Sequence, residues 1–294
     1  MSGRTFKPRL VAKESAMNQR TKLHKADASG MDNPLNFAVT NRDRATIDMV
    51  AAAVEHKHTL LAFQPVMMSS NTKQVGFYEG LIRVMDETGR IIPAKDFVHV
   101  IEDRELGRKI DVLALNMGLR TLYENPSLRL SINMSARSIG YPSWNRTLRK
   151  WLDRSDTLAE RLILEITESS AMELPEKVVE FMDQQQSKGI SFALDDFGAG
   201  HTALRYFKDF CFDVLKIDGQ FIQGISKDAD NQALTRAMVD IARHFDMLTV
   251  AEFVETADDM HTLIELGVDC LQGYYFSAPT TRPYWIDQKK QATR

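Results

Sequence analysis

The stretch LLAFQPVMMSSNTKQVGFYEGLIR, residues 60–83, contains two apolar runs that each resemble a buried β-strand. The runs are LLAFQPV (60–66) and VGFYEGLIR (75–83), and only eight residues separate them. A crossover between parallel strands needs about a dozen residues or more, whereas antiparallel strands need only a short turn. The stretch therefore predicts that the first strand runs antiparallel to the second.

Six further apolar runs follow along the chain. They are LRLSIN (128–133), LILEIT (162–167), ISFALD (190–195), DVLKI (213–217), LTVAE (248–252) and CLQGYYF (270–276). Most are continuously apolar, as is typical of strands that are buried on both faces. Amphipathic segments with helical periodicity lie between them, for example 175–189 and 227–247, and 84–127 has room for two helices. Eight strand–helix units over about 240 residues predict an α/β fold, a modified TIM (β/α)8 barrel with an antiparallel first strand, over residues 45–290.

Residues 1–44 differ from the rest in composition. They hold nine Lys or Arg against four Asp or Glu and show no clear period, so we expect a mobile basic arm. The net charge of the whole chain is -3, which does not favour a nucleic-acid polymer as partner. Cys211 and Cys270 are too few for a disulfide framework. Since no signal peptide or transmembrane segment is evident, we expect a cytoplasmic protein.

Polar side chains occur at or just after the carboxyl ends of the predicted strands. They are Glu79, Asn133, Glu165, Glu168, Asp195, Asp196, Lys216, Asp218, Glu252, Glu255 and Gln272. In a TIM barrel these ends form the face that carries the active site. Converging carboxylates repel one another unless cations neutralise them, and oxygen ligands without clustered Cys or His favour Mg²⁺ or Mn²⁺.

Such a carboxylate site suits a substrate that carries phosphate, and two metal ions could serve the hydrolysis of a phosphodiester. Lys216 could hold the attacking water or the developing charge, and Glu252 could act as general base. The alternative for these two residues is a buried ion pair in the barrel mouth. Asp195 and Asp196 are adjacent, so both reach one site only if the chain leaves the strand there, which FGAG at 197–200 allows.

The same residues lie in motifs that resemble those of the EAL domain family, bacterial phosphodiesterases that hydrolyse cyclic di-GMP. The motifs are FQPV (63–66), EGLIR (79–83), INMS (132–135), LEITES (164–169), DDFGAG (195–200), LKID (215–218), AEFVE (251–255) and LQGYYF (271–276). The resemblance implies a modified TIM barrel that converts cyclic di-GMP to linear pGpG with two Mg²⁺ or Mn²⁺ ions per site. It also implies a homodimer, because in this family the DDFGAG loop couples dimerisation to catalysis.

The resemblance also implies a role for each site residue. The implied metal ligands are Glu79, Asn133, Glu165, Asp195 and Asp196. The implied catalytic residues around the nucleophilic water are Lys216 and Glu252. The implied substrate contacts are Gln64, Arg83 and Gln272, with Arg83 on a phosphate. Glu168 is expected to anchor the DDFGAG loop, Glu255 to lie close to the metals, and Asp218 to support this set.

The chain departs from the family pattern at several positions. Gly80 stands where alanine is usual, Phe253 replaces a common glycine, and His201 lies in a loop that reads GAGHTA. One alternative function is a catalytically silent cyclic di-GMP receptor, but such members usually lose metal ligands and this chain keeps them all. Another is an enolase-like barrel, which needs a capping domain that 44 polar residues cannot supply. The sequence therefore favours the phosphodiesterase.

Overall fold

The structure, a computed structural model, describes residues 34–199 and 208–286. The predicted arm up to residue 33, the loop variant at His201 and the predicted barrel end at 287–290 lie outside the described residues. Helix α2 spans Pro34–Glu55 and crosses the predicted boundary between residues 44 and 45. The chain divides after Ala45 into two units, and all of the strands that the structure describes belong to the second unit, Thr46–Arg294.

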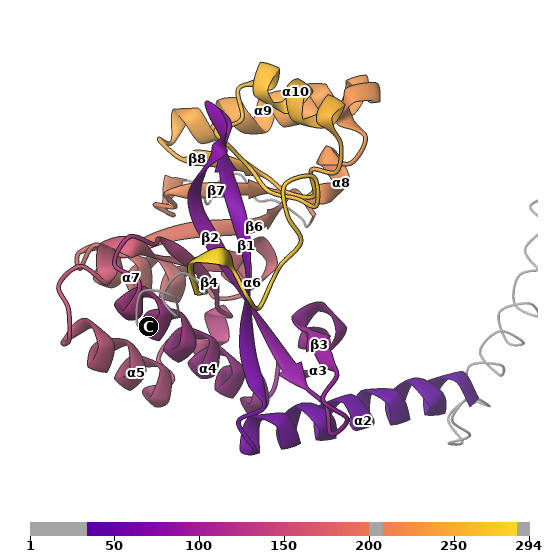
Figure 1. The fold of residues 1–294 in the computed structure, drawn as a ribbon, viewed down its shortest axis with the longest axis vertical. Helices are drawn as coiled ribbons and strands as arrows, with labels where there is room; N and C mark the ends of the chain where they lie inside the picture. The colour runs from indigo at the N-terminus through magenta and orange to yellow at the C-terminus, as the bar shows by residue number, and fades with distance from the viewer. Residues whose placement is uncertain (1–33, 200–207, 287–294) are drawn as a thin grey trace, which may run out of the picture. The chain divides into compact units, whose positions relative to one another are not determined.

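Eight of the described strands form a closed barrel. They are β1 (Thr59–Met68), β2 (Asn71–Met85), β4 (Leu130–Asn133), β5 (Leu162–Thr167), β6 (Ser191–Phe197), β7 (Val214–Ile217), β8 (Leu248–Ala251) and β9 (Cys270–Leu271). Their order is β1-β9-β8-β7-β6-β5-β4-β2, and pairing of β1 with β2 closes the sheet. β1 is antiparallel to both neighbours, whereas the other barrel pairs are parallel. The long strands β1 and β2 lie side by side in Figure 1. The predicted modified TIM barrel is confirmed.

The ends of some strands differ from the prediction. The turn between β1 and β2 is tighter than expected, with only Ser69 and Ser70 between the strands. A short strand, β3 (Ile91–Pro93), pairs with the end of β2 outside the barrel. The last predicted run, 270–276, is a strand only over its first two residues. Its remainder pairs with a loop instead, because the backbone N–H of Val254 donates to Gln272 O at 3.0 Å.

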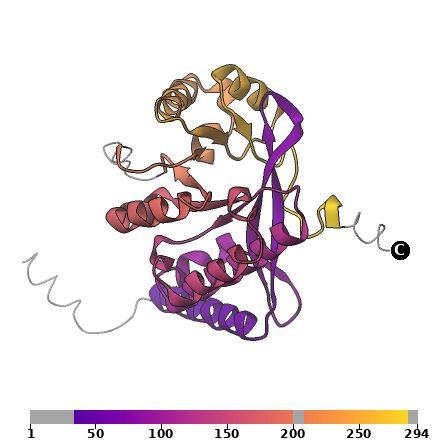
Figure 2. The same ribbon diagram turned by 90° about the vertical axis from the view of Figure 1, so that its left-hand side faces the viewer.

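Helices follow the strands and lie along the outer side of the barrel (Figure 2). They are α3 (Val98–Ile101), α4 (Glu105–Glu124), α5 (Pro142–Leu152), α6 (Glu168–Glu173), α7 (Pro175–Gln186), α8 (Gly219–Ile222), α9 (Ala229–His244) and α10 (Ala257–Leu266). Short 3₁₀ turns are η1 (Ala94–Asp96), η2 (Ala136–Ser138), η3 (Ala159–Arg161) and η5 (Ile225–Lys227). Asp228 caps α9 by accepting from the N–H groups of Asp230 and Asn231. None of the described helices combines the length and hydropathy needed to cross a membrane.

The core beside the carboxyl end of β4 depends on Ile132, which is buried between two glycines. A Cβ atom at Gly80 in β2 would lie 2.6 Å from Ile132 Cδ1. A Cβ atom at Gly118 in α4 would lie 2.6 Å from the same atom and 2.7 Å from Ile132 Cγ1. The volume of an alanine methyl at position 80 is therefore already filled by the end of the Ile132 side chain.

We predict that Gly80→Ala destabilises the fold by ~1–3 kcal/mol, because Ile132 Cδ1 has no room to move toward Gly118. Ile132→Val removes that methyl group and alone should cost about 0.5–1.5 kcal/mol. The double variant should be no less stable than Ile132→Val, since the new methyl fills the vacated space. Urea unfolding measures all three free energies of unfolding. Additive losses in the double variant would contradict this packing.

Candidate active site

Lys216, on β7, lies among four carboxylates delivered by other strands of the barrel. Its Nζ is 2.8 Å from Glu165 Oε2 at the end of β5 and 2.9 Å from Asp195 Oδ1 on β6. Glu252 Oε1, directly after β8, is also 2.9 Å away, and Glu79 Oε2 on β2 is 3.7 Å away. All five side chains are buried, with Lys216 only 1% exposed. The cluster forms where the carboxyl ends of the parallel strands meet, as predicted for this fold.

Burial and mutual charge shift the pKa values of this cluster. Burial lowers the pKa of Lys216, but the surrounding carboxylates raise it further, so the ammonium stays protonated. Burial raises the pKa of Glu165 to about 8, because Lys216 only partly offsets burial and repulsion from neighbouring acids. Burial also raises the pKa of Glu252 well above its ordinary value, against the attraction of Lys216. One ammonium group therefore does not balance the negative charge that these strands bring together.

The carboxylate oxygens fit divalent cations. Glu79, Glu165 and Asp195 each offer one oxygen atom, and these atoms lie within 4.8 Å of one another. The same holds for Asp195, Asp196 and Glu252. Glu165 Oε1 is buried without a hydrogen-bond donor, as suits an oxygen whose partner is a cation. Fully ionised, the five carboxylates and the one ammonium would carry a charge of -4, which two divalent cations would neutralise.

Asp196 reaches the site through an irregularity inside a strand. The sequence predicted that the chain leaves the strand at this point, but β6 continues to Phe197. Asp196 has φ +55°, and the pairing of β6 with β7 shifts register between Leu194 and Phe197. The bulge lets two consecutive acids face the same site. Burial, together with repulsion from Asp195, raises the pKa of Asp196 to about 6.

Three amide side chains form a network around Glu79. Asn133 Nδ2 donates to Glu79 Oε1 at 2.8 Å, and Gln272 Nε2 donates to Glu79 Oε2 at 2.6 Å. Gln272 Nε2 also lies 3.1 Å from Gln64 Oε1, and Gln64 Nε2 donates to the backbone oxygen of Ser277 at 3.1 Å. Burial raises the pKa of Glu79, but Lys216 and the amides lower it more. Asn133, Gln64 and Gln272 thus lie at the predicted site.

Arg83 and Asp218 lie at the rim of the cluster. Arg83 follows Glu79 by four residues on β2, so both side chains leave the same face of the strand. Burial lowers the pKa of Arg83, and the charge of Glu79 opposes this shift. Asp218 caps α8 by accepting from the N–H of Gln220 at 2.9 Å, and its charge contributes to the raised pKa of Asp196.

Glu168 and Glu255 lie outside the carboxylate cluster in the described part of the chain. Glu168 is buried at the start of α6, and its Oε2 accepts from the N–H of Gly198 at 3.0 Å. This bond joins α6 directly to the loop that follows β6. Glu255 is exposed, and its Oε1 accepts from Gln223 Nε2 at 3.3 Å.

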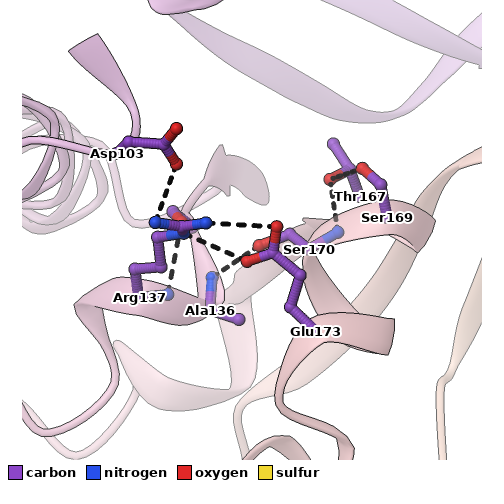
Figure 3. A network of polar contacts seen from close by, with 8 residues as sticks. Asp103, Ala136, Arg137, Thr167, Ser169, Ser170 and Glu173 are labelled. Atoms are coloured by element: carbon purple, nitrogen blue, oxygen red, sulfur yellow. Dashed lines mark hydrogen bonds and ion pairs between the residues drawn. The ribbon is translucent and has the colours of Figure 1, made fainter. Parts of the chain in front are cut away.

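A polar network that the sequence did not indicate holds α6 in place (Figure 3). Arg137, in η2 after β4, pairs with Asp103 at 2.7 Å and with Glu173 of α6 at 3.0 Å. The N–H of Ala136 donates to Ser170 Oγ at 2.8 Å. The segments that follow Asn133 and Glu165 are therefore joined outside the cluster. Arg137 was missed because its partners are distant in the sequence and it lies beyond a strand end.

We predict that Lys216→Met lowers the free energy of unfolding by about 3–5 kcal/mol in metal-free buffer, because it leaves buried carboxylates without their cation. Lys109→Met is the matched control. Lys109 lies 3.7 Å from Glu105 at an exposed position, and its loss should cost less than about 1 kcal/mol. Chemical denaturation measures both variants. Equal losses would show that the cluster does not depend on Lys216.

Comparison with known proteins agrees with this arrangement. Residues 47–279 match the model of the EAL domain. Cyclic di-GMP phosphodiesterase PdeB of Shewanella oneidensis is 29% identical over 81% of this chain and 28% of its own length. PdeA of Borreliella burgdorferi, also named a cyclic di-GMP phosphodiesterase, is 33% identical over 68% of this chain and 31% of its own. The chain thus spans about a third of the length of these curated relatives.

Solved structures show the same fold. The FimX EAL domain from Pseudomonas aeruginosa bound to c-di-GMP has a TM-score of 0.73 at 24% identity, covering 81% of this chain and 97% of that one. The PaMucR phosphodiesterase in complex with c-di-GMP has a TM-score of 0.70 at 27% identity, covering 80% and 97%. On the match to the family model over most of its length, this chain belongs to the EAL domain family.

Proposed function

We propose that this EAL domain is a metal-dependent phosphodiesterase that opens cyclic di-GMP to linear pGpG. The observation that carries the proposal is the buried set of carboxylates around Lys216, whose excess negative charge suits two divalent cations. The names of PdeB and PdeA and the c-di-GMP complexes of FimX and PaMucR support the choice of substrate.

Two Mg²⁺ or Mn²⁺ ions would be held by Glu79, Asn133, Glu165, Asp195 and Asp196. All of these offer oxygen atoms, which hard cations prefer. When bound, the ions supply a lowered pKa for the attacking water and charge neutralisation at the phosphodiester. Asn133 and Gln272 keep Glu79 in place by donating to its two oxygens. The amides thus orient one ligand before any cation arrives.

Glu252 would accept a proton during the reaction, and Lys216 would stabilise the negative charge that develops. Lys216 donates toward Glu252 Oε1, which orients that carboxylate at the mouth of the barrel. Glu252 then accepts the proton of the attacking water as general base. The permanently charged ammonium of Lys216 meets the negative charge that develops on the phosphate.

The remaining site residues would hold the substrate and the loop. Arg83 presents a guanidinium group, which suits a phosphate oxygen. Gln64 and Gln272 contribute amide groups from the same end of the barrel, and Glu168 anchors the DDFGAG loop through Gly198. Asp218 adds negative charge near Asp196, whereas a position of Glu255 close to the metals stays a prediction from the sequence. A homodimer, a cytoplasmic location, and residues 1–44 as an arm beside a barrel over 45–290 stay predictions from the sequence.

We predict that the purified protein converts cyclic di-GMP to pGpG in the presence of Mg²⁺ or Mn²⁺, as measured by chromatography of the products. Glu252→Gln removes the proton acceptor and should lower kcat by at least about 100-fold. Glu79→Ala should cause a loss of several orders of magnitude, because it removes a metal ligand.

Glu265→Gln, at an exposed position in α10, is the matched control and should keep normal turnover. Absence of pGpG from the folded wild-type protein with either metal would refute the proposed activity. Tight binding of intact cyclic di-GMP in that case would identify a receptor instead.

We also predict that Mn²⁺ or Mg²⁺ stabilises the protein without substrate. At a metal concentration about 100 times its dissociation constant, the gain should be about 2.7 kcal/mol per site. Asp195→Asn removes an oxygen shared by both ligand groups and should abolish most of this gain. Asp183→Asn, at an exposed position in α7, should retain it. Urea unfolding with metal and with chelator measures the difference, and equal curves would contradict the metal site.

A further inference from the structure

Phe253 has an unusual backbone conformation directly beside the site. It follows Glu252, and its side chain is 53% exposed. Its φ is +54°, in the left-handed region that a bulky side chain occupies only at a cost in free energy. Glycine adopts this conformation without that cost, so the backbone at position 253 would favour glycine over phenylalanine. The chain therefore keeps an aromatic ring here against the preference of its own backbone.

Hydrogen bonds on both sides hold this conformation. The N–H of Val254 donates to Gln272 O, and Val254 O accepts from the N–H of Tyr275, both at 3.0 Å. The N–H of Glu252 donates to Ile217 O at 3.3 Å. The two residues that flank Phe253 are thus joined to β7 and to the segment after β9. Because these bonds hold the backbone, they also fix the direction in which the Cα–Cβ bond of Phe253 points.

Gly219 provides the surface on which the ring lies. A Cβ atom at Gly219 would be 2.5 Å from Phe253 Cδ2 and 2.7 Å from Phe253 Cγ. A larger residue at position 219 would therefore displace the ring. Gly219 follows Asp218 directly and begins α8, three residues after Lys216. The ring of Phe253 thus packs between the ends of β7 and β8, the two strands that deliver Lys216 and Glu252.

Two more exposed aromatic residues lie on the adjoining segment. Tyr274 is 66% exposed and Tyr275 is 42% exposed, and both follow Gln272 closely. The carboxyl ends of β8 and β9 therefore present flat apolar rings outside the charged cluster. A ligand with a charged centre and flat aromatic ends matches this arrangement.

We propose that Phe253 is a specificity residue whose ring stacks against a guanine base of the substrate. This inference rests on the proposed hydrolysis of cyclic di-GMP. Cations and Arg83 would bind the phosphates of the substrate. Its two bases would then be free to contact the exposed aromatic rings beside the cluster. Stacking on an aromatic ring uses the face of a base, and it explains why a strained, exposed phenylalanine is kept beside Glu252.

The test compares Phe253→Gly, Phe253→Ala and Phe253→Trp in the full chain. Phe253→Gly and Phe253→Ala should both raise KM for cyclic di-GMP by about tenfold or more with little change in kcat, whereas Phe253→Trp should keep KM near normal. The gain in stability on adding Mn²⁺ without substrate should be unchanged in all three, because no base is then present to stack. Phe253→Gly alone should also raise Tm, by about 2–4 °C, because it relieves the backbone.

Asp246→Gly is the matched control, since Asp246 has φ +56° and lies before β8, at the end opposite the site. It should raise Tm by less than Phe253→Gly does, because Asp tolerates the left-handed region better than Phe, and it should leave KM unchanged. Unchanged KM in Phe253→Gly, with an active wild type, would overturn the role of Phe253 alone, as would a change in oligomeric state that accounts for the effect. If the wild type binds cyclic di-GMP without hydrolysis, calorimetric affinities of the same variants decide the inference. A wild type that neither binds nor hydrolyses it overturns both proposals.

Discussion

The carboxylate cluster at the carboxyl end of the barrel depends on the ion pairs that the buried ammonium of Lys216 forms. Moving a carboxylate out of water costs several kcal/mol unless a cation and hydrogen bonds compensate it. An ammonium has three N–H donors, and three carboxylate oxygens lie within 2.9 Å of Nζ, from Glu165, Asp195 and Glu252. Glu79, at 3.7 Å, is the fourth, and its oxygens accept from Asn133 and Gln272 instead. The three N–H donors of Lys216 thus serve three of the four carboxylates, and amide side chains serve the fourth, Glu79.

The rest of the fold brings these groups together. Parallel strands place their carboxyl ends at one face, which explains how residues as distant as Glu79 and Glu252 meet. A regular strand would turn one of two adjacent acids away, and the bulge at Asp196 prevents this. Glu168 and the Arg137 network then join the segments that follow β4, β5 and β6.

The strands could be predicted because buried parallel strands appear as continuous apolar runs, and the short connection at 67–74 predicted the antiparallel pair. The acids at the strand ends could be predicted from that pattern too. β3 was missed because three residues carry no periodic signal. The bulge at Asp196 and the left-handed backbone at Phe253 depend on pairing with distant segments, which local sequence does not encode. The sequence shows that Gly80 departs from the family pattern. The structure shows that Ile132 Cδ1 fills the space that a side chain at position 80 would need.

The antiparallel first strand also decides where the chain enters the barrel. Thr59 pairs with Val84, beyond Glu79 along β2, so β1 starts at the end where the carboxylates lie. In a barrel with all strands parallel, the first strand would start at the opposite end. The end of helix α2 is therefore connected by a few residues to Leu60, which pairs with Arg83. The chain therefore passes from helix α2 directly to the end of the barrel at which the carboxylates lie.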